Sequence, residues 1–159
     1  MKNKFFFAGI IFALIFISGC ITKKNVPSVV INNQDSTVKN TPQVIINQQS
    51  FAVEVASSNQ EKSLGLSGRQ SLGQNSAMLF VYDNYAVRFF WMQDMNFPLD
   101  IIWIKDNSVV ACVENVPLLT AGEVTRVTSP TAVNYVLETV SGTCQRYKIT
   151  AGDFVDIKL

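Results

Sequence analysis

Histidine is absent from all 159 residues of the chain. This absence excludes every catalytic triad or Cys–His pair that needs an imidazole base, and every zinc site that uses an imidazole ligand. The chain has only 3 cysteines, which are too few for a four-thiolate zinc or iron–sulfur site. The composition therefore predicts neither a metal nor a cofactor, and it excludes the most familiar hydrolase mechanisms.

Basic residues are also few, with 13 Lys and Arg against 12 Asp and Glu, and they form no block. Proteins that bind nucleic acid usually carry a basic patch or stripe, so we expect no nucleic-acid partner. A chain of this length has room for one domain with appendages, not for two full domains.

Long apolar runs are missing except at the N-terminus, where Lys2 and Lys4 precede apolar residues 5–17. A helix over this run would be roughly 20 Å long, short of the ~30 Å hydrocarbon core of a bilayer. The pattern is typical of a signal peptide, and an uncleaved N-terminal anchor is the alternative.

Residues 17–20, Ile-Ser-Gly-Cys, resemble a bacterial lipobox. This resemblance implies removal of residues 1–19 and an extracytoplasmic protein that Cys20 anchors to a bacterial membrane through lipid.

The stretch that follows is rich in Asn, Gln, Ser, Thr and Lys and has only scattered valines. Such a composition buries too little apolar surface to offset the entropy of ordering. We therefore expect residues 20–41 to form a flexible tether and residues 42–159 to form a single domain.

Outside the cytoplasm the remaining thiols, Cys112 and Cys144, are expected to form a disulfide. Two buried reduced thiols are the alternative.

Short runs of β-prone residues, separated by turn signals, dominate the rest of the sequence. Residues 58–61, Ser-Asn-Gln-Glu, have the spacing of a capping box, which predicts a short helix over residues 59–66. A helical turn is also expected within residues 141–147. The predicted fold is mostly β, a small β-barrel or jelly-roll-like sandwich with one or two short helices. The expected strands cover residues 44–46, 51–55, 78–82, 87–92, 99–104, 109–113, 124–128, 133–140 and 154–159.

Three segments of the chain stand out together. They are Gly65-Leu-Ser-Gly-Arg69 with Ala77-Met-Leu-Phe-Val-Tyr82, then Phe90-Trp-Met92 with Asn96-Phe-Pro-Leu-Asp-Ile-Ile102, and finally Tyr135-Val-Leu-Glu138 with Gly152-Asp153. In order, spacing and residue types they resemble a bacterial and archaeal family, the domain of unknown function 192. The resemblance covers roughly residues 44–159 and implies a small β-barrel or jelly-roll-like sandwich, but no function.

Two carboxylates in these segments are candidate site residues. Asp100 has the strand parity of Ile102, and Glu138 has that of Val136, so both are expected on otherwise apolar faces. Carboxylates rarely occupy such faces unpaired, and Arg69 is the expected partner because guanidinium binds carboxylate bidentately. Three interpretations stay open: a polar cluster that binds a ligand, an acid–base pair as in glycoside cleavage, and a structural ion pair.

Aromatic residues crowd around residues 89–97. A strand directs alternate side chains to opposite faces, so the consecutive run from Phe89 to Met92 cannot be buried on one face alone. The outward pair either lines a binding groove or is covered by the loop that follows. Trp91 and Met92 are the candidate binding residues of this run.

The first functional hypothesis is a non-catalytic, membrane-anchored domain that binds a glycan or a protein partner in the cell envelope. Its candidate binding residues are Arg69, Trp91, Met92, Asp100 and Glu138. The second is a hydrolase of envelope polysaccharide, in which Asp100 and Glu138 are the candidate catalytic residues. The third is a purely structural envelope component, which predicts no cleft.

Overall fold

A computed structural model of the chain describes residues 41–118 and 125–159. The predicted signal peptide, the lipobox with Cys20, and residues 20–40 of the predicted tether lie outside the described residues. Within the part that is described, no helix has the length and apolar character needed to cross a bilayer.

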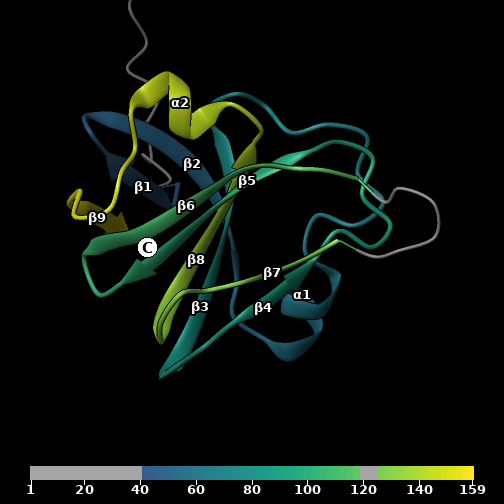
Figure 1. Cartoon of the computed structure of the whole chain (residues 1–159), viewed down its shortest axis with the longest axis horizontal. Helices are drawn as coiled ribbons and strands as arrows, with labels where there is room; N and C mark the ends of the chain where they lie inside the picture. The colour runs from purple at the N-terminus through teal and green to yellow at the C-terminus, as the bar shows by residue number, and fades with distance from the viewer. Residues whose placement is uncertain (1–40, 119–124) are drawn as a thin grey trace, which may run out of the picture. The chain divides into compact units, whose positions relative to one another are not determined.

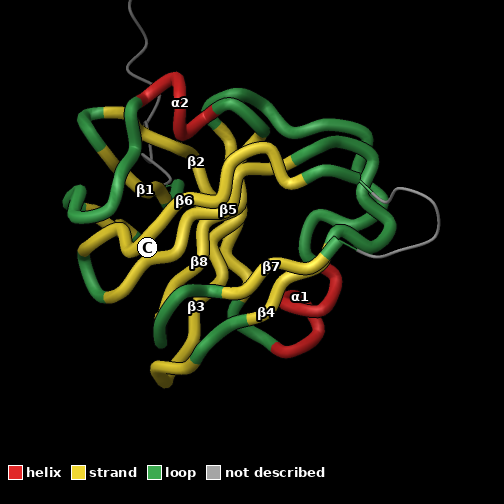
Figure 2. The backbone as a smooth tube through the Cα atoms, viewed as in Figure 1, coloured by secondary structure: helices red, strands yellow, loops and turns green. Residues whose placement is uncertain are grey.

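Short β-strands make up most of the described chain, as Figure 2 shows, and the two helices are each little more than one turn. In chain order the elements are β1 (Gln43–Ile46), β2 (Gln49–Ala56), α1 (Asn59–Leu64), β3 (Ser76–Ala86), β4 (Phe89–Trp91), β5 (Leu99–Lys105), β6 (Ser108–Val116), β7 (Arg126–Thr128), β8 (Val133–Val140), α2 (Thr143–Tyr147) and β9 (Val155–Lys158).

Seven strands form one curled sheet in the order β6-β5-β8-β3-β2-β1-β9, and β4 pairs with β7 in a separate two-stranded ladder (Figure 1). Among the strands of the described residues only the β2–β3 pair is parallel, and α1 lies in the connection between these two strands. The two edges of the sheet meet at one corner, where Val109 N donates to Asp153 O (2.9 Å) and Val155 N donates to Asn107 O (2.8 Å). This half-barrel confirms the predicted mostly β fold class.

Both faces of the central strands are buried. The inner core lies inside the curl and includes Leu79, Ile102 and Leu137. The outer core lies on the opposite face, over β3, β5 and β8, and includes Phe80 and Trp103. Because β5 contributes to both cores, its residues 101–104, Ile-Ile-Trp-Ile, form a continuous apolar run and not an alternating pattern.

Helix α1 begins as the sequence predicts. The Ser58 side chain accepts from Glu61 N, and the Glu61 carboxylate accepts from Ser58 N, which is a complete capping box. The helix ends at Leu64, two residues before the predicted end, because Gly65 leaves the helical conformation with φ +50°. A side chain is strained at this φ, so the position favours glycine.

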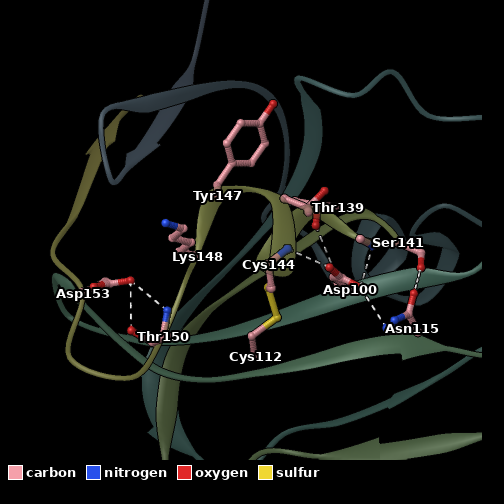
Figure 3. The surroundings of a disulfide bond; sticks show 12 residues. Asp100, Cys112, Asn115, Thr139, Ser141, Cys144, Tyr147, Lys148, Thr150 and Asp153 are labelled. Carbon is pink, nitrogen blue, oxygen red and sulfur yellow. Dashed lines mark hydrogen bonds between the residues drawn. A yellow bond between two sulfur atoms is a disulfide. The ribbon is translucent and has the colours of Figure 1, made fainter.

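The expected disulfide joins Cys112 of β6 to Cys144 of α2, as Figure 3 shows. Their Cα atoms are 6.6 Å apart, and they are separated by 32 residues in the sequence. Restricting a loop of that length in the unfolded chain stabilises a fold by roughly 3 to 4 kcal/mol in the chain-entropy treatment. The bond thus holds α2 onto the inner core, to which Cys144 belongs.

Candidate functional site

An open pocket with a volume of about 280 Å³ lies between α1, the loop that follows it, and β4. Its walls combine aromatic side chains with a few polar groups. The lining residues are Asn59, Lys62, Ser63, Leu64, Gly65, Leu66, Ser67, Phe80, Tyr82, Phe89, Phe90, Trp91, Met95 and Glu138. Most of these residues lie in the three segments that resemble the domain of unknown function 192, so segments that are distant in sequence line one cavity.

Glu138 is the acidic group of this pocket. Its position on β8, opposite Met78 of β3 and Ile101 of β5, directs the side chain to the outer core. The residue is only 5% exposed, and no hydrogen bond or ion pair joins its carboxyl group to another described residue. Burial raises the pKa of Glu138 to about 8, because the charged form loses its hydration. The carboxyl group is therefore mostly protonated at neutral pH.

The loop after α1 forms the wall next to this carboxyl group. A Cβ atom at Gly65 would lie 3.9 Å from Glu138 Oε2 and 3.4 Å from Phe80 Cζ. Two hydrogen bonds to the loop after β4 hold this wall in place. Ser67 Oγ donates to Gln93 O (3.0 Å), and Gly68 N donates to Asp94 O (2.8 Å). Glycine at position 65 therefore keeps side-chain atoms away from the carboxyl group.

Strand β4 forms the aromatic wall, and its side chains alternate as the sequence predicts. Phe89 is 71% exposed and Trp91 is 50% exposed, and both line the pocket. Phe90 is on the other face of the strand and packs edge-on against Phe80, with ring centroids 4.8 Å apart, and these two rings also line the pocket. Met92 is fully buried in the outer core. Of the two predicted binding residues in this run, Trp91 therefore faces the pocket, whereas Met92 is a core residue.

Two cations of the chain lie against the ring of Tyr82. Lys62 Nζ is 4.5 Å from the ring centroid, and Arg88 Cζ is 3.7 Å from it. Both distances fit cation–π contacts. Burial raises the pKa of the Tyr82 hydroxyl, and the nearby Arg88 partly opposes this change. The sequence interpretation missed Tyr82 and Lys62 as site residues. Lys62 lies on the helix that the capping box predicts, shortly before Gly65, and this position was a signal that could have found it.

Arg69 does not bind either candidate carboxylate, which corrects the sequence expectation. Its guanidinium makes a bidentate contact with Glu54 on the exposed side of β2, with Nη2 2.8 Å from Oε2. This hydrogen bond lowers the pKa of Glu54. The Arg69 backbone carbonyl also accepts from Asn96 Nδ2 (2.9 Å), which ties two of the family-like segments together. Arg69 supports the loop beside the pocket, but it does not line the pocket.

Asp100 lies on the opposite face of the sheet from Glu138. It is paired in register with Thr139, so its side chain points to the α2 side of the sheet (Figure 3). Its carboxylate accepts backbone N–H groups from Asn115 (2.8 Å), Gly142 (3.2 Å) and Cys144 (2.8 Å). Because the sheet separates the two acids, they cannot act as the acid–base pair of the hydrolase hypothesis, nor do they form an ion pair with Arg69.

Among the described residues, one cluster has ligand atoms close enough for a metal ion, namely Asp100, Cys112 and Cys144, whose ligand atoms lie within 4.8 Å of one another. Both sulfur atoms belong to the disulfide, and the Asp100 oxygens already accept backbone N–H groups. Metal-binding cysteines must be thiolates, so this cluster does not fit a metal in the oxidised protein.

A family model described as "Uncharacterized ACR", DUF192, matches residues 42–157. A crystal structure of a putative transcription regulator from Sinorhizobium meliloti 1021 has 24% identity and a TM-score of 0.66, covering 73% of this chain and 92% of that one. A crystal structure of a protein of unknown function from Novosphingobium aromaticivorans DSM 12444 has 28% identity and a TM-score of 0.65, covering 72% and 83%. No match was found among curated proteins.

Proposed function

The chain belongs to the DUF192 family, whose description assigns no activity, and we propose that it is a non-catalytic ligand-binding domain of the bacterial cell envelope. The observation that carries this proposal is the Glu138 carboxyl group, which is only 5% exposed, has no hydrogen-bond or ion-pair partner among the described residues, and lines an open pocket. Burial makes the ionised form of this group unfavourable. Titratable groups that burial perturbs beside a cleft are candidates for functional sites, and a ligand in this pocket would supply hydrogen bonds that the protein does not.

The surroundings of Glu138 favour binding over the two other hypotheses. A purely structural component predicts no cleft, whereas this domain has an open pocket with two exposed aromatic side chains, Phe89 and Trp91. Hydrolysis by two carboxylates requires both acids to flank one bond, and the second acid, Asp100, is on the other face of the sheet. A pocket with apolar walls and one buried polar group is typical of small-molecule binding sites.

A screen of thermal unfolding tests whether the pocket binds a ligand. The full-length protein is heated in the presence of glycans, peptidoglycan fragments, nucleotides, amines and peptides, one class at a time. A ligand at a hundred times its dissociation constant adds about 2.7 kcal/mol, which raises the melting temperature by several degrees. Ser63→Trp, a change on exposed α1 that fills the pocket, is expected to abolish the shift.

Gln60→Trp is the matched control, because Gln60 lies on the same helix, is exposed, and does not line the pocket. This variant is expected to retain the shift. The proposal fails if no class of ligand stabilises the protein, or if the stabilisation is the same in the Ser63→Trp variant.

The proposal includes attachment to the membrane through Cys20, which rests on the lipobox-like sequence at residues 17–20. Two or three acyl chains on one residue give stable anchoring, whereas a single chain does not. In cells fed a radiolabelled fatty acid, the wild-type protein is expected to carry label and to sediment with membranes. Cys20→Ser is expected to lose the label, whereas Ser18→Ala, which keeps the cysteine, should retain it. Labelled Cys20→Ser protein would contradict lipidation at this residue.

A further inference from the structure

The aromatic wall of the pocket has the shape of a stacking platform. Phe89 and Trp91 occupy alternate positions of β4, so their side chains lie on the same face, roughly 7 Å apart along the strand. Both are at least half exposed, although aromatic side chains of this size are usually well buried. An exposed aromatic strip with polar residues around it is typical of a binding surface.

Polar groups share the pocket lining with this strip. The Glu138 carboxyl group, 5% exposed, has no hydrogen-bond or ion-pair partner among the described residues. Asn59, Ser63 and Ser67 add an amide and two hydroxyl groups to the lining. The pocket therefore combines aromatic side chains with several neutral donors and acceptors.

The cations beside the pocket argue against a cationic ligand, which aromatic walls and a carboxyl group would otherwise suit. Lys62 lines the pocket, and Lys62 and Arg88 already contact the ring of Tyr82. An ammonium ligand would compete with these contacts and would be repelled by both charges. The occupant is therefore not a cation, and the neutral donors and acceptors of the lining favour a molecule with one apolar face and a hydroxylated edge.

A sugar ring has this chemistry, because its C–H bonds form an apolar face and its hydroxyl groups surround the edge. We infer that the pocket binds one ring of a neutral glycan, with the C–H face on Phe89 and Trp91 and a ring hydroxyl hydrogen-bonded to Glu138. A volume of about 280 Å³ is at the lower end for ligand pockets, which fits one ring of a longer chain. This inference rests on the proposed ligand-binding function and specifies the class of ligand.

The test measures binding of soluble neutral oligosaccharides built from glucose, galactose, mannose or N-acetylglucosamine. The full-length protein is held in a detergent without a sugar head group, so that the detergent does not occupy the pocket. Saturation-transfer NMR is expected to show the strongest transfer to C–H protons on one face of a sugar ring. Trp91→Ala is expected to weaken the affinity about tenfold or more, because truncating a central aromatic contact commonly costs at least 1.4 kcal/mol.

Phe154→Ala is the matched control, since Phe154 is 68% exposed but lies outside the pocket. It should leave the affinity unchanged. The inference is overturned if no oligosaccharide binds at millimolar concentration, or if Trp91→Ala binds as tightly as the wild-type protein. If a nucleotide, amine or peptide instead stabilises the protein and Ser63→Trp abolishes that effect, the ligand-binding function stands and only the glycan assignment fails. If no class of ligand binds, both fail.

Discussion

Replacing Glu138 with glutamine is expected to stabilise the folded domain by roughly 3 to 5 kcal/mol above pH 8. The pKa of Glu138 is about 8 in the folded protein, against a usual value of 4.5. The native state therefore keeps a proton that the unfolded chain releases between these two pH values. Each pH unit in this window lowers the free energy of unfolding of the wild-type protein by about 1.4 kcal/mol relative to a neutral isostere. Below pH 4.5 both proteins hold a neutral group, so their stabilities should converge.

Urea unfolding of the two full-length proteins, measured from pH 4 to pH 9, checks this prediction. The difference between their free energies of unfolding should be below 1 kcal/mol near pH 4 and should grow steadily up to pH 8. Glu114→Gln is the control, because Glu114 occupies an exposed position of β6. The free energy of unfolding of this variant should stay close to that of the wild-type protein at every pH. Parallel stability profiles for wild type and Glu138→Gln would show that the buried carboxyl group is not protonated in the folded domain.

The predicted stabilisation has a functional meaning. Glutamine has nearly the same size as glutamate and is uncharged at every pH, so it avoids the pH-dependent loss of stability that comes from the buried carboxyl group. A domain that keeps glutamate at this position forgoes several kcal/mol at neutral and alkaline pH, which is a large fraction of typical domain stability. A buried acid kept at this expense indicates a role that glutamine would not fill equally well, and hydrogen bonding to a ligand is such a role.

The sequence predicted most of the secondary structure, because turn residues and apolar periodicity are local signals. The strand over residues 133–140 was predicted with the bounds of β8. The predicted strand over residues 124–128 appears as β7, although residue 124 lies outside the described part of the chain. Alternation along residues 89–92 also predicted that one pair of side chains would point outward, and in the structure the exposed pair is Phe89 and Trp91.

The arrangement of the candidate site was less accessible to sequence reasoning. Strand parity correctly placed Asp100 and Glu138 on buried faces, but it is defined within a strand and does not relate one strand to another. The register between β5 and β8, which pairs Asp100 with Thr139, puts the two acids on opposite faces. The partner of Arg69 was likewise set by tertiary packing, because Glu54 lies on β2, which pairs with the strand that follows the Arg69 loop.

Asp100 has a structural role in this arrangement, and its replacement is expected to have the opposite effect to that of Glu138→Gln. The Asp100 carboxylate accepts three backbone N–H groups, from Asn115 at the end of β6, from Gly142, and from Cys144 of α2. Both oxygens are thus used, and the residue is fully buried. Hydrogen bonds to a charged acceptor are stronger than neutral ones, and a buried donor left without an acceptor is unfavourable.

Asp100→Asn is therefore expected to destabilise the domain by roughly 3 to 5 kcal/mol, because the amide NH₂ replaces one acceptor and faces a backbone donor. Thermal unfolding should show a fall in melting temperature on the order of 10 °C. Asp83→Asn, a change at an exposed position of β3, should leave the melting temperature nearly unchanged.

Two further measurements on the folded Asp100→Asn protein test the role of the carboxylate. Amide hydrogen exchange at Asn115, Gly142 and Cys144 should accelerate. Ligand binding at Glu138 should persist, since the sheet separates the two acids. An Asp100→Asn protein as stable as the wild type would contradict this role, and one that folds normally but loses ligand binding would place Asp100 at the site after all.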